Sequence, residues 1–123
     1  MSKRILIVDD AAFMREMLRD LLTEEGFEIA AEAADGDEAV AAFAEYSPDL
    51  VLLDIVMPRK SGLEALREMV ARDADATVVM CSALGQESLV MEALDAGAKD
   101  FVVKPFKPDR AIEVVKKVLE KDD

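Results

Sequence analysis

The feature that most constrains the fold of this chain is a regular alternation of short, mostly apolar runs and longer amphipathic stretches. The short runs are rich in Val, Ile and Leu, and each is followed by apolar residues at helical spacing. They occupy residues 5–8, 27–33, 50–53, 77–81 and 101–103. Five strand–helix units in this order predict an α/β fold in which a parallel sheet has helices on both faces.

The stretches between the predicted strands contain local signals for the ends of helices. Their apolar stripes lie at 14–22, 39–44, 63–70, 89–94 and 112–119. Asp35-Gly36 is typical of a turn before the second helix, and Ser61 with Glu64 fits a capping box at the start of the third. Pro108 suits the first turn of the last helix.

The polarity of the strands predicts their order in the sheet. Central strands of a parallel sheet are apolar throughout, whereas edge strands can be short or half polar. The first, third and fourth strands are apolar, the fifth is short, and the second includes Glu28 and Glu32. We expect residues 27, 29, 31 and 33 to share one apolar face of the second strand. The pattern predicts a flavodoxin-like, doubly wound (βα)5 fold with a five-stranded parallel sheet in the order 2-1-3-4-5.

Polar side chains stand where the predicted strands end. Asp9 and Asp10 follow the first strand, Asp54 the third, Ser82 the fourth and Lys104 the fifth. The carboxyl ends of parallel strands meet at one edge of the sheet, and ligands bind there where the winding direction reverses. We therefore expect these side chains to surround one crevice between the first and third strands. The alternative for each Asp taken alone is a turn or a helix cap.

Three carboxylates in one crevice predict a bound divalent cation. Two unit charges about 4 Å apart repel each other by about 4 kcal/mol near a protein surface. The chain has no histidine and one cysteine, so the ligands would be oxygens, which favour Mg²⁺, Mn²⁺ or Ca²⁺. Mg²⁺ fits best, because it usually binds through one or two carboxylates together with a phosphate.

The same residues are suited to phosphoryl transfer. A carboxylate can attack phosphorus and form an aspartyl phosphate. Lys104 and the cation could neutralise the charge of the transferring group, and the Ser82 hydroxyl could donate a hydrogen bond to a phosphoryl oxygen.

The composition limits the partners and the compartment. The chain has 123 residues, the usual size of one domain, so we treat residues 1–123 as one domain. The net charge of −12 argues against nucleic acid and anionic membranes as partners. No run approaches the ~20 apolar residues that span a bilayer, so we expect a cytoplasmic protein. Cys81 lies in an apolar run and is expected to be a buried core residue.

Several motifs together resemble response-regulator receiver domains over nearly the whole chain. The matching segments are residues 5–10, 54–58 with Gly62, 81–83, 97–101 and 104–106. The resemblance implies that Asp54 accepts a phosphoryl group from the phosphohistidine of a histidine kinase. Asp9, Asp10 and Asp54 would bind Mg²⁺, or Mn²⁺ in its place, directly or through water. The backbone carbonyl of Val56 would be a further ligand.

The resemblance also implies roles for residues around the phosphate. Ser82 and Lys104 would contact it, and the Lys104–Pro105 peptide bond would be cis. On phosphorylation Ser82 would move towards the phosphate, the loop containing Leu84 would follow, and Phe101, the switch aromatic, would turn inward. The alternative for Phe101 is simple core packing. The fourth helix, fifth strand and fifth helix would form the output face, with central residues Ala83, Val90, Phe101 and Val103.

Within this family, the chain is most similar to the stand-alone chemotaxis response regulators. The similarity lies in residues 11–15 and 82–86, and we expect no DNA-binding output domain after Asp123 unless the chain is a fragment of a longer protein. The implied partners are a CheA-like histidine kinase as phosphodonor and a flagellar motor switch protein or another output protein. We expect a monomer that catalyses only its own phosphorylation and dephosphorylation and is otherwise not an enzyme.

Two positions that flank the phosphate in this family are apolar here. They are Val56 and Leu84, where the enteric chemotaxis regulators have polar side chains. Neither side chain can orient an attacking water. We therefore expect slow self-dephosphorylation and a separate phosphatase that resets the switch.

Other functions compete with this interpretation. A phosphatase with an aspartyl nucleophile needs an acid–base Asp two residues later, where this chain has Val56. A flavin-binding electron carrier needs a Ser/Thr-rich phosphate loop after the first strand, where Asp9 and Asp10 would repel the FMN phosphate. A receiver domain of another phosphorelay and a receiver-like interaction module that is never phosphorylated are the remaining alternatives.

Overall fold

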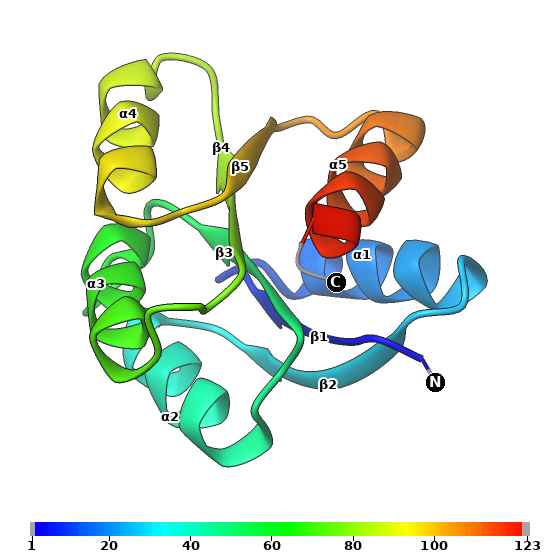
Figure 1. Cartoon of the computed structure of the whole chain (residues 1–123). Coiled ribbons are helices and arrows are strands. Elements are labelled where there is room, and N and C mark those ends of the chain that lie inside the picture. Colours follow the sequence, from blue (N-terminus) through cyan, green and yellow to red (C-terminus); the bar gives the residue numbers. More distant parts are fainter. Residues whose placement is uncertain (1, 122–123) are drawn as a thin grey trace.

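The structure is a parallel five-stranded sheet between two layers of helices (Figure 1). The computed structural model describes residues 2–121. The strands lie in the order β2-β1-β3-β4-β5, which confirms the predicted topology. In chain order the elements are β1 (Arg4–Val8), α1 (Ala12–Glu24), β2 (Glu28–Ala33), α2 (Gly36–Tyr46), β3 (Leu50–Asp54), α3 (Gly62–Arg72), β4 (Val78–Ser82), α4 (Glu87–Ala96), β5 (Asp100–Val103) and α5 (Pro108–Lys121). Within residues 2–121, no helix is long and apolar enough to cross a membrane.

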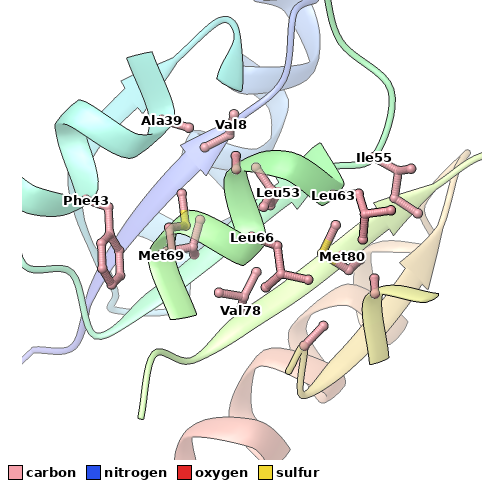
Figure 2. Close-up of a cluster of buried hydrophobic side chains, with 14 of the residues drawn as sticks. Val8, Ala39, Phe43, Leu53, Ile55, Leu63, Leu66, Met69, Val78 and Met80 are labelled. Atoms are coloured by element: carbon pink, nitrogen blue, oxygen red, sulfur yellow. The ribbon is translucent and has the colours of Figure 1, made fainter. Parts of the chain in front are cut away.

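Each face of the sheet has its own hydrophobic core. Helices α2, α3 and α4 cover one face, and α1 and α5 cover the other (Figure 1). On the first face, Leu66 and Met69 of α3 pack against Leu53 of β3 and Met80 of β4 (Figure 2). Burial on both faces explains why every residue of β3 and β4 is buried. The predicted contrast between apolar central strands and more polar edge strands is therefore confirmed.

Cys81 is part of this buried interior. It lies in β4 and is 1% exposed. Burial raises the pKa of its thiol, because a thiolate would lose its hydration there. The prediction that Cys81 is a core residue is confirmed.

The second strand differs from its prediction. Its register with β1 shifts after Ile29, since Ile5 pairs with Ile29 but Leu6 pairs with Ala31. This bulge leaves Ala30 between two paired residues, so the alternation of faces changes there. Ile29 packs on the core under α1 and α5, whereas Ala31 packs on the core under α2, α3 and α4. The expectation that residues 27–33 present one apolar face was wrong.

Local signals place most helix starts correctly. The capping box of Ser61 and Glu64 is present at the start of α3, and Pro108 is the first residue of α5. At α2 the helix already begins at Gly36 of the predicted turn, with Asp35 as the extended N-cap, whose side chain accepts a hydrogen bond from the Glu38 amide at 2.9 Å. The Lys104–Pro105 bond is cis, as expected.

Candidate functional site

The carboxyl ends of β1 and β3 bring three aspartates together. Asp9 and Asp10 follow β1, and Asp54 is the last residue of the neighbouring strand β3. One carboxylate oxygen from each lies within 4.8 Å of the other two. Asp9 and Asp54 are buried, whereas Asp10 is exposed. Two of the acids therefore form the floor of the site, and Asp10 stands at its mouth.

Lys104 and Ser82 approach the same point from β5 and β4. The Lys104 ammonium donates hydrogen bonds to Asp9 Oδ2 at 2.7 Å and to Asp54 Oδ2 at 3.1 Å. The backbone amide of Lys104 donates to the Ser82 carbonyl at 2.7 Å, which fixes the chain just after β5. Ser82 is buried at the end of β4. A cation thus lies beside the acids, and Ser82 ends the strand next to that of Asp54 at the same edge of the sheet.

Burial opposes the contact between Lys104 and the acids in setting the pKa values of Asp54 and Lys104. Burial raises the pKa of Asp54, and the charges of Asp9 and Asp10 raise it further, while the hydrogen bond and charge of Lys104 lower it. For Lys104, burial lowers the pKa, but the hydrogen bonds to Asp9 and Asp54 together with their charges outweigh it and raise the pKa overall. Lys104 therefore stays protonated at neutral pH. Its one positive charge faces three carboxylates, so the site favours additional positive charge.

The segment after Asp54 is fixed at both of its ends. The Ile55 amide donates to the Cys81 carbonyl at 3.1 Å, and the Gly62 amide donates to the Ile55 carbonyl at 2.8 Å. Helix α3 starts so close to β3 that a Cβ on Gly62 would lie 1.9 Å from the Asp54 carbonyl oxygen. Val56 lies between these anchors with its side chain 54% exposed. The backbone at Val56, the predicted carbonyl ligand, follows Asp54 by two residues and is anchored on both sides.

The start of α2 also holds this segment, which sequence reasoning missed. The Gly36 amide donates to the Lys60 carbonyl at 3.1 Å. The buried Asp35 carboxylate lies 3.3 Å from an Arg59 guanidinium nitrogen, and a Cβ on Gly36 would lie 2.3 Å from the Lys60 carbonyl oxygen. The sequence signal at this point was the Asp35-Gly36 pair before α2. Such a pair indicates a turn, but it does not indicate that the turn contacts residues 59–60.

The residues predicted for the output face line one apolar cavity. Its volume is about 190 Å³ and it lies between α4 and β5, beside Ser82. Ala83, Val90, Phe101 and Val103 all contribute to its wall. Phe101 is half-buried and packs against the core, and Leu84 at the rim is 81% exposed. The predicted switch aromatic therefore adjoins unfilled space.

Known proteins are similar to this chain over most of its length. The model of the response regulator receiver domain family matches residues 5–116. Chemotaxis protein CheY of Bacillus subtilis is 56% identical over 119 residues, which are 97% of this chain and 99% of that protein. CheY of Thermotoga maritima is 52% identical over 118 residues, with coverages of 96% and 98%. A chain in the crystal structure of the CheX-CheY-BeF₃-Mg²⁺ complex from Borrelia burgdorferi matches with a TM-score of 0.91 and 42% identity, over 94% of this chain and 88% of that one.

Proposed function

The chain belongs to the response regulator receiver domain family of two-component systems, and from this premise we propose that Asp54 accepts a phosphoryl group from the phosphohistidine of a histidine kinase. The observation that supports this most is the buried Asp54 carboxylate, which Lys104 contacts at 3.1 Å and two further acids flank. An anionic nucleophile in this setting needs compensating charge at the moment when a phosphate arrives.

The donor set fits a hard divalent cation, Mg²⁺ or Mn²⁺. Asp9, Asp10 and Asp54 supply oxygens within 4.8 Å of one another, and the chain has no histidine. These carboxylates would hold the ion together with the backbone carbonyl of Val56. When bound, the ion supplies charge neutralisation for the transferring phosphoryl group.

Phosphoryl transfer then follows from the positions of the side chains. An Asp54 carboxylate oxygen attacks phosphorus, the phosphorus–nitrogen bond of the phosphohistidine breaks, and its electron pair returns to the imidazole nitrogen. Lys104 moves its hydrogen bonds from the carboxylates to a phosphoryl oxygen, and the Ser82 hydroxyl donates to another. Apart from this transfer and the later hydrolysis of the aspartyl phosphate, we propose no enzymatic activity.

The new phosphate would act as a switch. It adds a charge of about −1.5 to −2 at neutral pH. Ser82 moves towards it, the loop containing Leu84 follows, and Phe101 turns inward, for which the adjoining cavity offers room. Moving such an equilibrium from about 1:99 to about 99:1 needs about 5.5 kcal/mol of differential stabilisation. The surface formed by α4, β5 and α5 would change its affinity for an output protein.

The proposed pathway is chemotaxis, with a flagellar motor switch protein as output and a CheA-like kinase as donor. Support comes from the two relatives that bear the name chemotaxis protein CheY. A separate phosphatase would reset the switch, and the Borrelia burgdorferi CheX-CheY complex supports that class of partner. Binding of the purified motor switch protein should be stronger with BeF₃⁻ and Mg²⁺ than without them. Equal binding in both states would contradict the chemotaxis output.

The acceptor is tested by intact mass after incubation with acetyl phosphate and Mg²⁺. We expect a gain of one phosphoryl group in the parent and in Asp20→Asn, which removes an exposed carboxylate on α1. Asp54→Asn should gain none, because an amide is not a nucleophile towards phosphorus. If the parent gains no mass and binds no BeF₃⁻, the chain is an interaction module that is not phosphorylated. If Asp54→Asn is still phosphorylated, the acceptor is another residue.

A further inference from the structure

A pair of side chains behind the acidic site has no part in the proposed reaction. We propose that Arg15, held in place by Glu32, is a positioning residue that fixes the Asp9–Asp10 turn for cation binding. This inference rests on the proposed metal site and names a residue outside it.

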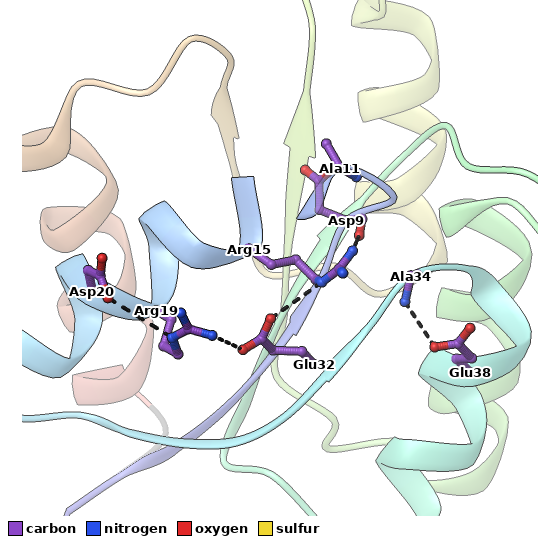
Figure 3. A network of polar contacts seen from close by, with 8 residues as sticks. All are labelled: Asp9, Ala11, Arg15, Arg19, Asp20, Glu32, Ala34 and Glu38. Carbon is purple, nitrogen blue, oxygen red and sulfur yellow. Dashed lines mark hydrogen bonds and ion pairs between the residues drawn. The ribbon is translucent and has the colours of Figure 1, made fainter. Parts of the chain in front are cut away.

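Arg15 connects α1 to the end of β1. Its Nη1 donates to the Asp9 carbonyl oxygen at 2.6 Å, and its Nε lies 3.3 Å from Glu32 Oε1 (Figure 3). The side chains of Arg15 and Glu32 are 19% and 27% exposed, so water competes only partly for these contacts. The guanidinium therefore spans β1 and β2 directly behind the acids.

The contact matters because of where the Asp9 carbonyl lies. The Asp9 amide donates to the Ala33 carbonyl at 3.1 Å, and Oδ1 accepts from the Ala11 amide at 2.9 Å. These bonds fix the Asp9 amide and side chain, but not the peptide group that leads to Asp10. The hydrogen bond from Arg15 to the carbonyl of that peptide sets its rotation, and with it the direction of the exposed Asp10 carboxylate.

Glu32 keeps the guanidinium aligned. Its Oε1 faces Arg15, and its Oε2 accepts from Arg19 Nη1 at 2.9 Å (Figure 3). A planar guanidinium can donate to a carboxylate and a carbonyl at once in fixed directions, which a lysine ammonium does less well. Arg19 shares Glu32 and has the same charge, but it pairs with Asp20 and Glu32 and not with Asp9. It is therefore a matched control.

Charge and positioning predict opposite effects on Mg²⁺ affinity. A guanidinium beside three carboxylates repels a divalent cation, so removing its charge alone would tighten Mg²⁺ binding. If Arg15 positions the turn, its removal weakens binding instead, because Asp10 loses its orientation. The sign of the change separates the two roles.

The experiment is isothermal titration calorimetry of Mg²⁺ into the full chain, without phosphodonor. We expect Arg15→Gln and Arg15→Lys to weaken Mg²⁺ binding by about three- to tenfold, and Glu32→Gln by less. Arg19→Gln should stay within about twofold of the parent. The rise in unfolding temperature on adding Mg²⁺ gives a second measure of affinity, which remains usable if a variant is less stable.

Three results would overturn the inference, and they are distinguishable. Unchanged or tighter Mg²⁺ binding in both Arg15 variants, with normal binding in the parent, would leave the metal site intact and remove the positioning role. Equal weakening in Arg19→Gln would show a general effect of α1 stability. Failure of the parent itself to bind Mg²⁺ would overturn the metal site and this inference together.

Discussion

Val56 and Leu84, which follow β3 and β4 at the carboxyl edge of the sheet, are apolar and exposed. Hydrolysis of an aspartyl phosphate would need a polar group at such positions to orient water. We therefore predict that the purified phosphoprotein loses its phosphate over minutes or longer. Val56→Asn should shorten this lifetime severalfold, because its amide can hold a water near the phosphorus. Phosphate release after removal of the phosphodonor measures both lifetimes.

A substitution far from Asp54 serves as the control for that change in lifetime. Met91→Gln replaces another exposed apolar residue, on α4, and should leave the lifetime unchanged. A parent half-life of seconds would contradict the assignment of slow hydrolysis to the two apolar residues.

Lys104 neutralises part of the acidic cluster, so its removal should lower stability and raise metal affinity. Without Mg²⁺, we expect Lys104→Met to lower the free energy of unfolding by about 1–3 kcal/mol, since Asp9 and Asp54 lose their cation in a mostly buried site. Added Mg²⁺ should recover more stability in the variant than in the parent. Urea unfolding with and without Mg²⁺ measures this.

Lys116→Met is the matched control for Lys104. Lys116 pairs with Glu25 at 3.0 Å on the surface, and its loss should cost no more than about 1 kcal/mol with no dependence on Mg²⁺. Equal Mg²⁺ responses in the two variants would mean that Lys104 does not neutralise the cluster.

At the scale of elements, the start of α3 determines where Asp54 lies. A Cβ on Gly62 would stand 1.9 Å from the Asp54 carbonyl oxygen, so Gly62→Ala must push α3 away from β3. We expect a loss of about 2 kcal/mol or more in the free energy of unfolding, as for an overpacked core. Phosphorylation by acetyl phosphate should also slow, because the backbone of the acceptor is displaced.

Gly26→Ala is the control for Gly62→Ala, because it adds backbone strain without moving α3 away from β3. Gly26 has a φ of +91°, and nothing in the described part of the chain would lie within 4 Å of its Cβ. The strain should cost about 1–2 kcal/mol and leave phosphorylation unchanged. If Gly62→Ala phosphorylates at the parental rate, the close approach of α3 does not position Asp54.

The elements also show what the sequence could predict and what it could not. Topology places the ends of parallel strands at one edge, so the meeting of Asp9, Asp54 and Lys104 followed from strand order alone. The contact between Arg15 and Glu32 could not be predicted from the strand order. It depends on the β2 bulge, and no residue type in that segment of alanines and glutamates marks a bulge.

At the scale of the whole molecule, the net charge of −12 makes stability depend on salt. Mutual repulsion destabilises a compact chain and is screened as the Debye length falls. We predict that the free energy of unfolding rises on the order of 1 kcal/mol between about 0.02 M and about 0.5 M NaCl. Urea unfolding at each salt concentration tests this. A fall in stability with salt would show that attractive ion pairs outweigh the net repulsion.

The bulge at Ala30 has a consequence for sequence comparison and design. A strand has a parity, in which odd and even residues face opposite sides, and the bulge reverses that parity halfway along β2. Glu32 faces Arg15 only after the reversal. Deleting Ala30 would give an unbroken strand in which Ile29, Ala31 and Glu32 keep their present faces, because Ala31 would directly follow Ile29 on the opposite side. Straightening β2 with Ala30 retained would instead pair Glu32 with Val8, on the face under α2, α3 and α4 and away from Arg15.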